Sequence, residues 1–151
     1  MTTTTNPTAT RLAVIGQGYV GLPLAIRAVE QGFDVVGFDV DETKVARLSS
    51  GSSVVEDISD DRLGAAIASG RYAASTDPAS LTGFEVAVIS VPTPLRDGMP
   101  DLSYIEQAAK TLAAHLRPGA TVVLESTTYP GTTEELVVPI LANGSGLTAG
   151  T

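Results

Sequence analysis

The chain contains no cysteine. This absence excludes a disulfide framework, a thiolate metal site and a cysteine nucleophile within the chain, and it fits a reducing compartment. No apolar run approaches the roughly 20 residues that a membrane-spanning helix needs. The first ten residues, MTTTTNPTAT, lack the basic region and apolar core of a secretion signal. We therefore expect a disordered, threonine-rich tail over residues 1–10 and a cytoplasmic location.

Basic residues are also scarce. Nine lysines and arginines stand against 17 aspartates and glutamates, which gives a formal net charge of −8. Such a surface repels phosphate backbones and anionic lipids, so we expect neither nucleic acid nor a membrane as a partner. A phosphate-bearing small ligand can still bind, because backbone N–H groups at a helix start need no basic side chain. We expect no metal site.

What is present is a regular alternation of short β-rich runs with helical patterns, which is typical of a parallel sheet with crossover helices. The pattern predicts strands at 12–15, 34–38, 72–75, 85–90 and 121–124, and helices at 18–31, 41–48, 59–69, 101–115 and 132–142. The sequence therefore predicts a single α/β domain over residues 11–151, with a Rossmann-type, doubly wound and mainly parallel sheet.

Three local features of these elements are open to test. In the first helix we expect Val20, Leu24 and Ala28 to face the core. The prolines and the glycine of residues 91–100 predict that no regular element runs through this loop. After Ala142 the chain becomes rich in glycine and serine, and we expect the last helix to end there.

A glycine motif, G-x-G-x-x-G, spans residues 16–21. The motif is weak by itself, but here it follows a buried strand and opens an amphipathic helix, which is the context that gives it meaning. Gly16 is expected to permit the tight turn, Gly18 to let a pyrophosphate approach the backbone, and Gly21 to let helix and strand pack closely. The helix start then offers unpaired N–H groups to phosphates.

An acidic residue at the end of the next strand is the second requirement of a dinucleotide site. Asp39 lies 18 residues after Gly21, directly after the predicted strand. Its carboxylate is expected to accept the ribose hydroxyls of adenosine and to repel a 2′-phosphate, so the cofactor is expected to be NAD and not NADP. Lys44 can reach the ribose side of the cofactor, and an ordinary solvated helix lysine is the alternative.

The chain resembles the UDP-glucose/GDP-mannose dehydrogenase family, which oxidises the C6 hydroxymethyl group of a nucleotide sugar to a carboxylate. Three stretches carry the resemblance: VIGQGYVGLPLA at 14–25, SVPTPL with PDLSY at 90–95 and 100–104, and LESTTYPGTTEE at 124–135. The sequences of these three stretches are most similar to those of the family branch that acts on UDP-N-acetylhexosamines, such as the UDP-N-acetylglucosamine 6-dehydrogenases.

The resemblance implies functional roles for individual loop residues. The alternative is that these residues only cap strands and helices. Thr127 matches the family threonine that positions the hydrolytic water, and we assign Glu125 no catalytic step. The resemblance also implies cofactor contacts beyond those of Gly16, Gly18, Gly21, Asp39 and Lys44. These further contacts are made by Tyr19 and Val20 of the glycine loop, Pro92 and Thr93 after the fourth strand, and Ser126 and Thr127 near the nicotinamide.

The family also has parts that this sequence lacks. Full members continue into a central helix and a sugar-binding domain, and they supply a catalytic cysteine, a lysine and an asparagine. We therefore expect the chain to bind NAD without turnover, to meet its UDP-sugar only together with the missing domain, and to oligomerise through the missing region.

Three other interpretations stay open. The first is a stand-alone NAD-binding or sensing module without catalysis, although the glycine- and serine-rich end favours a truncated domain. The second is the cofactor domain of a UDP-glucose 6-dehydrogenase. The third, a hydroxyacid or 6-phosphogluconate-type dehydrogenase, shares the glycine motif but does not account for the other two stretches.

Overall fold

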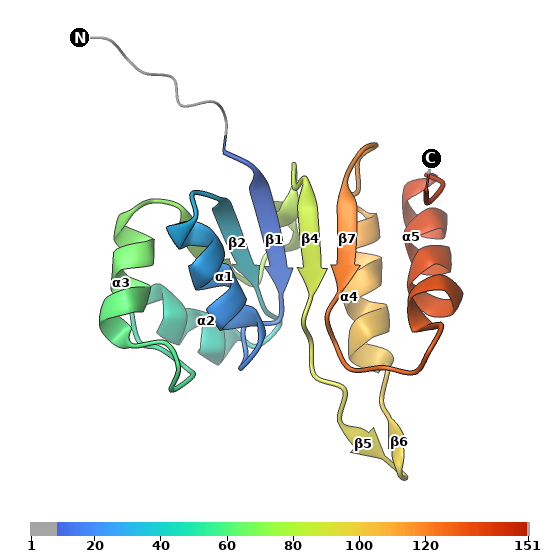
Figure 1. The fold of residues 1–151 in the computed structure, drawn as a ribbon, viewed down its shortest axis with the longest axis horizontal. Helices are drawn as coiled ribbons and strands as arrows, with labels where there is room; N and C mark the ends of the chain where they lie inside the picture. Colours follow the sequence, from blue (N-terminus) through green and yellow to red (C-terminus); the bar gives the residue numbers. More distant parts are fainter. Residues whose placement is uncertain (1–8, 151) are drawn as a thin grey trace, which may run out of the picture.

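Five parallel strands form the centre of the molecule in a computed structural model that describes residues 9–150 (Figure 1). The strands are β1 (Arg11–Ile15), β2 (Asp34–Phe38), β3 (Tyr72–Ser75), β4 (Val86–Ile89) and β7 (Thr121–Leu124). Their order in the sheet is β3-β2-β1-β4-β7, and every neighbouring pair is parallel. All five strands occur where the sequence predicts them. Most of the tail expected at residues 1–10 lies outside the described residues.

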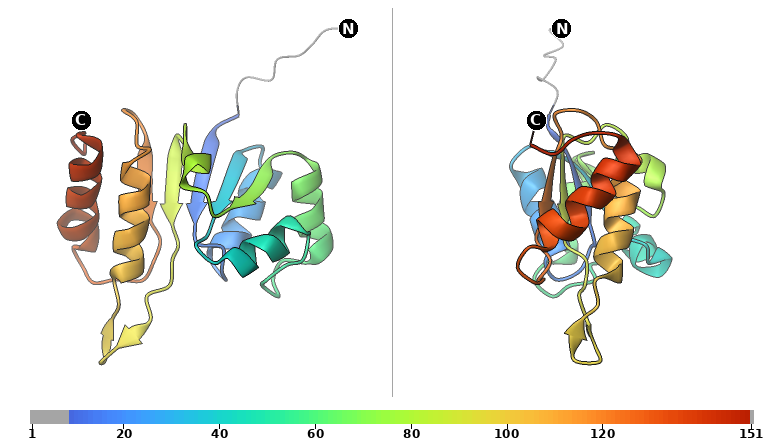
Figure 2. Two further views of the ribbon diagram at one scale, coloured as in Figure 1. Left: turned by 180° about the vertical axis from the view of Figure 1, so that it is seen from behind. Right: turned by 90° about the vertical axis from the view of Figure 1, so that its right-hand side faces the viewer.

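Helices cover both faces of this sheet (Figure 2). The helical elements are α1 (Gly21–Glu30), α2 (Glu42–Ser49), α3 (Asp60–Ala68), η1 (Pro78–Leu81), α4 (Ser103–Ala113), η2 (Thr133–Val137) and α5 (Val138–Ser145). Because side chains alternate along a strand, β1 sends Leu12 and Val14 into a core shared with α1 and α3. Ala13 and Ile15 enter a second core shared with α4. The predicted single α/β domain with a doubly wound, Rossmann-type sheet is confirmed.

The buried face of α1 differs from the predicted one. Val20 and Leu24 are 57% and 36% exposed, whereas Leu22 and Ile26 are fully buried. The helix begins at Gly21, and a Cβ added there would overlap the carbonyl oxygen of Gly16. This close approach fixes the rotation of the helix, so Leu22, Ile26 and Val29 form the buried row. Of the predicted face, only Ala28 is buried.

The loop over residues 91–100 contains a short hairpin, so the prediction of no regular element there is wrong. Strand β5 (Leu95–Arg96) pairs antiparallel with β6 (Met99–Pro100), and the hairpin projects beyond the sheet (Figure 1). Asp97 and Gly98 form the turn with φ values of 53° and 79°. A two-residue Asp-Gly turn favours such paired strands, and it forms here despite the neighbouring prolines.

The last helical segment is longer than predicted. It begins with one π-helical turn, η2, and α5 continues to Ser145 before Gly146 adopts a φ of 76°. Gly144 lies against α4, where an added Cβ would be 2.5 Å from the Cβ of Ala113. Close packing of two helices therefore retains in the helix a glycine that the sequence pattern assigns to a loop.

Candidate cofactor-binding site

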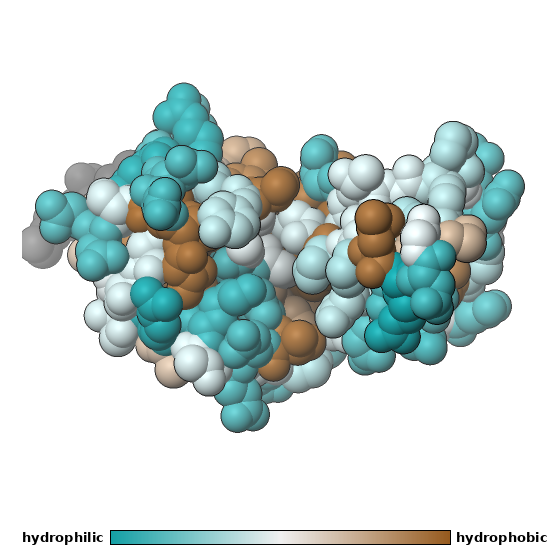
Figure 3. Space-filling view, turned by 90° about the horizontal axis from the view of Figure 1, so that it is seen from below, coloured by the Kyte–Doolittle hydropathy of each residue, from teal (hydrophilic) through white to brown (hydrophobic). Residues whose placement is uncertain are grey.

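The predicted site residues gather at the edge of the sheet where its parallel strands end. Ile15 pairs with Phe38 and with Ile89, and Ile89 pairs with Leu124, so the carboxyl ends of four strands are level. The loops after β1, β2, β4 and β7 therefore start side by side. Figure 3 looks onto this edge, where polar surface surrounds separate hydrophobic patches. In an open α/β sheet, ligands bind at this edge.

The three glycines of the motif have different surroundings. Gly16 has a φ of 94°, donates its N–H to the carbonyl of Phe38 at 2.8 Å, and has no room for a Cβ, which would lie 2.6 Å from the carbonyl oxygen of Ser90. Gly21 packs against Gly16. At Gly18, in contrast, an added Cβ would meet no heavy atom within 4 Å. Gly16 and Gly21 thus shape the turn, and Gly18 borders open space.

The start of α1 adjoins that open space. Val20 occupies the N-cap position without any side-chain hydrogen bond, and the first turn holds no acidic residue. The N–H groups of a helix start have no partner within the helix and carry partial positive charge. An uncapped helix start beside open space at Gly18 fits the pyrophosphate of a dinucleotide. Tyr19, 77% exposed, lies in the same turn.

Asp39 is held against the glycine loop. It is only 8% exposed, and its Oδ2 accepts the backbone N–H of Gln17 at 2.9 Å. Its Oδ1 accepts the backbone N–H of Asp41 at 3.0 Å. The ammonium group of Lys44 lies 3.3 Å from Oδ2 and forms an ion pair with the carboxylate, while the predicted approach of Lys44 to the cofactor ribose stays a prediction. The structure therefore joins the acid, the lysine and the glycine loop in one cluster.

Two residues of this cluster were not singled out from the sequence. Gln17 is fully buried, and its side-chain Oε1 accepts a hydrogen bond from the Tyr72 hydroxyl at 2.8 Å. Burial raises the pKa of Tyr72, and the negative charge of Asp39 raises it further. One sequence signal was available: Gly37 interrupts the otherwise bulky strand β2, and a glycine inside a strand marks close approach of another group.

Two serine hydroxyls connect the loop after β4 to the loops on either side of it, after β1 and after β7. Ser90 donates to the carbonyls of Ile15 and Gly16 at 3.0 and 3.1 Å, and Ser126 donates to the carbonyl of Val91 at 2.8 Å. Ser126 therefore connects the β7 loop to the loop that carries Pro92 and Thr93. Pro92 is exposed, and Thr93 is partly buried. The cofactor and catalytic roles of these residues stay predictions.

Thr127 and Glu125 are exposed on the loop after β7. The structure does not bring them into contact with Asp39 or Lys44, because β4 and β1 lie between β7 and β2 in the sheet. A cofactor that reached from Asp39 to Thr127 would have to extend along the whole edge. An extended dinucleotide crosses the edge of a doubly wound sheet in this manner.

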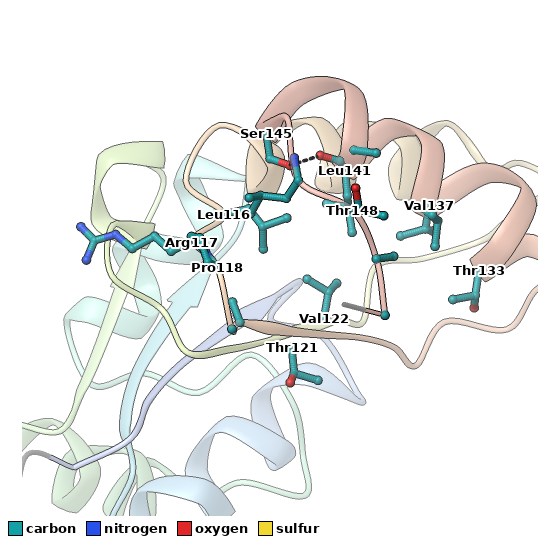
Figure 4. A pocket seen from close by; sticks show the side chains of 17 residues that line it. Leu116, Arg117, Pro118, Thr121, Val122, Thr133, Val137, Leu141, Ser145 and Thr148 are labelled. Carbon is teal, nitrogen blue, oxygen red and sulfur yellow. Dashed lines mark hydrogen bonds between the residues drawn. The ribbon is translucent and has the colours of Figure 1, made fainter.

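A cavity of about 480 Å³ lies elsewhere, between the edge strand β7 and helix α5 (Figure 4). Val122, Val137 and Leu141 line it together with residues 147–150, and it includes none of the predicted cofactor residues. Within residues 9–150, no group of three or more His, Asp or Glu side chains is placed to hold a metal ion. No helix in the same range is long and apolar enough to cross a membrane.

Residues 10–150 match the NAD-binding domain of the UDP-glucose/GDP-mannose dehydrogenase family. The chain belongs to this family. Its relatives include the UDP-N-acetyl-D-mannosamine dehydrogenase of Pyrococcus horikoshii, 40% identical over 141 residues, which are 93% of this chain and 34% of the relative. The UDP-N-acetyl-D-glucosamine 6-dehydrogenase of Salmonella typhi is 40% identical over 140 residues, which are 91% and 32% of the two chains.

Solved structures agree with this assignment. The UDP-D-ManNAc dehydrogenase of Pyrococcus horikoshii superposes with a TM-score of 0.89 at 40% identity, over 94% of this chain and 34% of that one. Lactate dehydrogenase from Eimeria maxima, with a TM-score of 0.60 at 16% identity, covers 94% of this chain and 42% of its own, and shares the fold alone. The NAD-binding domain thus spans about a third of the length of its relatives.

Proposed function

We propose that this domain binds NAD along the carboxyl edge of its sheet and serves a nucleotide-sugar 6-dehydrogenase that oxidises a UDP-N-acetylhexosamine to the uronic acid. The observation that carries the proposal is the junction of Asp39 with the glycine loop, 2.9 Å from the Gln17 N–H, beside an uncapped helix start. A phosphate site and a ribose acceptor lie next to each other there, which is what an adenine dinucleotide requires.

Each half of the edge has its own task in this proposal. Asp39 accepts the adenosine ribose hydroxyls, and Tyr19, Val20 and the N–H groups at the start of α1 surround the pyrophosphate. Pro92 and Thr93 line the cofactor after β4, while Ser126 holds the β7 loop in place through its bond to Val91. Thr127 orients the water that takes part in forming the acid.

The reaction requires groups that this domain does not supply. NAD accepts a hydride, and oxidation of an alcohol to an acid takes two such transfers with a covalently held aldehyde between them. A thiol nucleophile cannot come from this chain, which has no cysteine. The domain therefore contributes cofactor binding and orientation.

The names of the relatives support an N-acetylhexosamine substrate, since the two relatives described above act on UDP-N-acetylmannosamine and UDP-N-acetylglucosamine. A second candidate is UDP-glucose, which is favoured by the UDP-glucose dehydrogenase of Pyrobaculum islandicum, 34% identical with a TM-score of 0.83 over 93% of this chain and 34% of its own. Titration of a full-length dehydrogenase that carries this domain with each UDP-sugar would distinguish these substrates.

Cofactor titration tests the proposed site directly. We expect isothermal calorimetry to detect NAD binding that is tighter than NADP binding. Asp39→Asn retains an oxygen acceptor but removes the charge, so it should weaken NAD binding and narrow the difference between the cofactors. A hydrogen bond from a ribose hydroxyl to a charged group contributes about 1.5–3 kcal/mol. Arg27→Gln on the opposite end of α1 is the control. Equal affinities for NAD and NADP in the unmodified chain would contradict the role of Asp39.

A further inference from the structure

A buried polar cluster, formed by Gln17 and Tyr72, lies directly beneath the glycine loop. The amide Nε2 of Gln17 donates to the carbonyls of Val14 and Gly16, both at 3.1 Å. These two acceptors fix the orientation of the amide, because only its nitrogen can donate. The amide oxygen then accepts the Tyr72 hydroxyl at 2.8 Å. Gln17 is 0% exposed and Tyr72 is 4% exposed, so no polar group of the pair depends on solvent.

The space for this pair comes from strand β2. A Cβ added at Gly37 would lie 2.7 Å from the Tyr72 hydroxyl oxygen and would overlap the Gln17 amide oxygen. Tyr72 reaches the glycine loop from β3, which lies on the far side of β2 from β1. Because Gly37 has no side chain, the Tyr72 side chain of β3 has room to reach across β2 and contact the loop after β1.

The cluster is connected to Asp39 through the backbone. The same Gln17 whose side chain is held by Tyr72 donates its N–H to Oδ2 of Asp39 at 2.9 Å. Because Asp41 N–H bonds the other carboxylate oxygen at 3.0 Å, rotation of the carboxylate would break two hydrogen bonds. The side-chain bonds of Gln17 in turn keep its N–H in place. Tyr72 of β3 therefore restrains the Asp39 carboxylate indirectly, through Gln17.

We propose that Gln17 and Tyr72 are positioning residues that fix the Asp39 carboxylate and thereby set the selectivity for NAD over NADP. This inference rests on the proposed cofactor site. Rejection of a 2′-phosphate requires a carboxylate that cannot turn away from it. The need is acute here, since Lys44 lies 3.3 Å from Asp39 and would attract a phosphate if the carboxylate moved aside. An unlocked Asp39 would accept NADP more readily and hold NAD less well.

Two conservative variants test the inference. Tyr72→Phe keeps the aromatic ring and removes only the hydroxyl, and Gln17→Met keeps the side-chain length but removes both polar atoms. Tyr104→Phe, on the exposed side of α4, is the matched control. The dissociation constants of NAD and NADP are measured by calorimetry for each folded variant and for the double variant, with folding checked by circular dichroism.

We expect the ratio of the NADP and NAD dissociation constants to fall about fivefold or more in Tyr72→Phe and in Gln17→Met, as for the loss of one hydrogen bond. In the Gln17→Met background, Tyr72→Phe should change the ratio no further, because Tyr72 acts through Gln17. Tyr104→Phe should leave the ratio unchanged. If one of the two single variants does not fold, the ratio measured for the other is sufficient to test the inference.

Results that contradict the inference can be distinguished from results that contradict the proposed function. If the unmodified chain binds NAD selectively and the folded variants keep its ratio, even at a lower melting temperature, the pair is only structural and the inference is wrong while the proposed function stands. If the unmodified chain binds neither NAD nor NADP, the inference and the proposed function are both wrong. An additive effect of the two substitutions on the ratio would overturn the coupling between Tyr72 and Gln17.

Discussion

Tyr72 shows at the scale of one residue how its surroundings alter its chemistry. Burial, reinforced by the charge of Asp39, raises its pKa above the usual value near 10. A group with a raised folded pKa stabilises the fold fully below its unfolded pKa, and this contribution is lost as the pH rises through the folded value. Tyr72 therefore remains protonated and continues to donate to Gln17 at neutral pH.

This pKa shift predicts a loss of stability in alkali. The melting temperature of the domain should decrease as the pH rises above about 10, where unfolding releases the phenolic proton. In Tyr72→Phe the decrease should be smaller, although the variant is less stable at neutral pH because Gln17 loses a donor. Thermal unfolding followed by circular dichroism between pH 8 and 11.5 measures both effects. Parallel pH curves for the two proteins would show that Tyr72 ionises as easily in the fold as outside it.

At the scale of elements, the sequence predicts the order of strands and helices well, because each apolar run is long enough to identify. It predicts the faces and ends of helices less well. The rotation of α1 depends on contact between Gly21 and Gly16, and the length of α5 depends on contact between Gly144 and Ala113. Both contacts join residues of different elements, so no local pattern reveals them. The Asp-Gly turn of the hairpin is local, and its signal was outweighed by the prolines.

The candidate site follows the same division. The glycine motif and Asp39 are readable because their spacing along the chain is characteristic of dinucleotide sites. Gln17 is not, since a polar residue between two glycines is ordinarily a solvent-exposed loop residue. Its burial depends on Tyr72, 55 residues away, and on the open passage at Gly37. The residues of the proposed cofactor site are thus readable from the sequence, whereas the residues that support them are not.

The junction of the glycine loop and α1 gives a prediction at this scale. Gly18→Val should abolish NAD binding, because a side chain there would occupy the space assigned to the pyrophosphate. The domain should remain folded within about 0.5 kcal/mol, since no heavy atom lies within 4 Å of the added Cβ. Gly64→Val on α3, where the added Cβ also meets no atom within 4 Å, is the matched control and should bind NAD normally.

Calorimetry with NAD and urea denaturation of both variants test this prediction. Normal NAD binding by a folded Gly18→Val variant would show that the phosphates are held elsewhere on the edge. Unfolding of Gly18→Val alone would show that the open space at Gly18 is needed by the fold itself.

At the scale of the whole molecule, the two halves of the sheet edge differ in how completely the described residues specify them. Around Asp39 every polar group of the cluster has a partner within the domain. Around Thr127 the side chains of Glu125 and Thr127 are exposed, and the hydroxyls of Ser126 and Thr132 hold the loop through 2.8 Å hydrogen bonds to the carbonyls of Val91 and Tyr129. In the proposed function, the adenosine half of the site is therefore preorganised by this domain, whereas the exposed nicotinamide half would depend on contacts from further parts of a dehydrogenase.

This asymmetry predicts that the 151-residue chain binds NAD but forms no NADH from any UDP-sugar. Orientation of reactants alone is worth roughly 7–11 kcal/mol of barrier, and this domain orients only one of them. The absorbance of reduced nicotinamide, followed with UDP-N-acetylglucosamine, UDP-N-acetylmannosamine and UDP-glucose, measures turnover. Steady formation of NADH would require a nucleophile other than cysteine within the chain. In a full-length dehydrogenase that carries this domain, Thr127→Ala should slow acid formation more than it weakens NAD binding, and weaker NAD binding without a slower reaction would make Thr127 a cofactor-binding residue only.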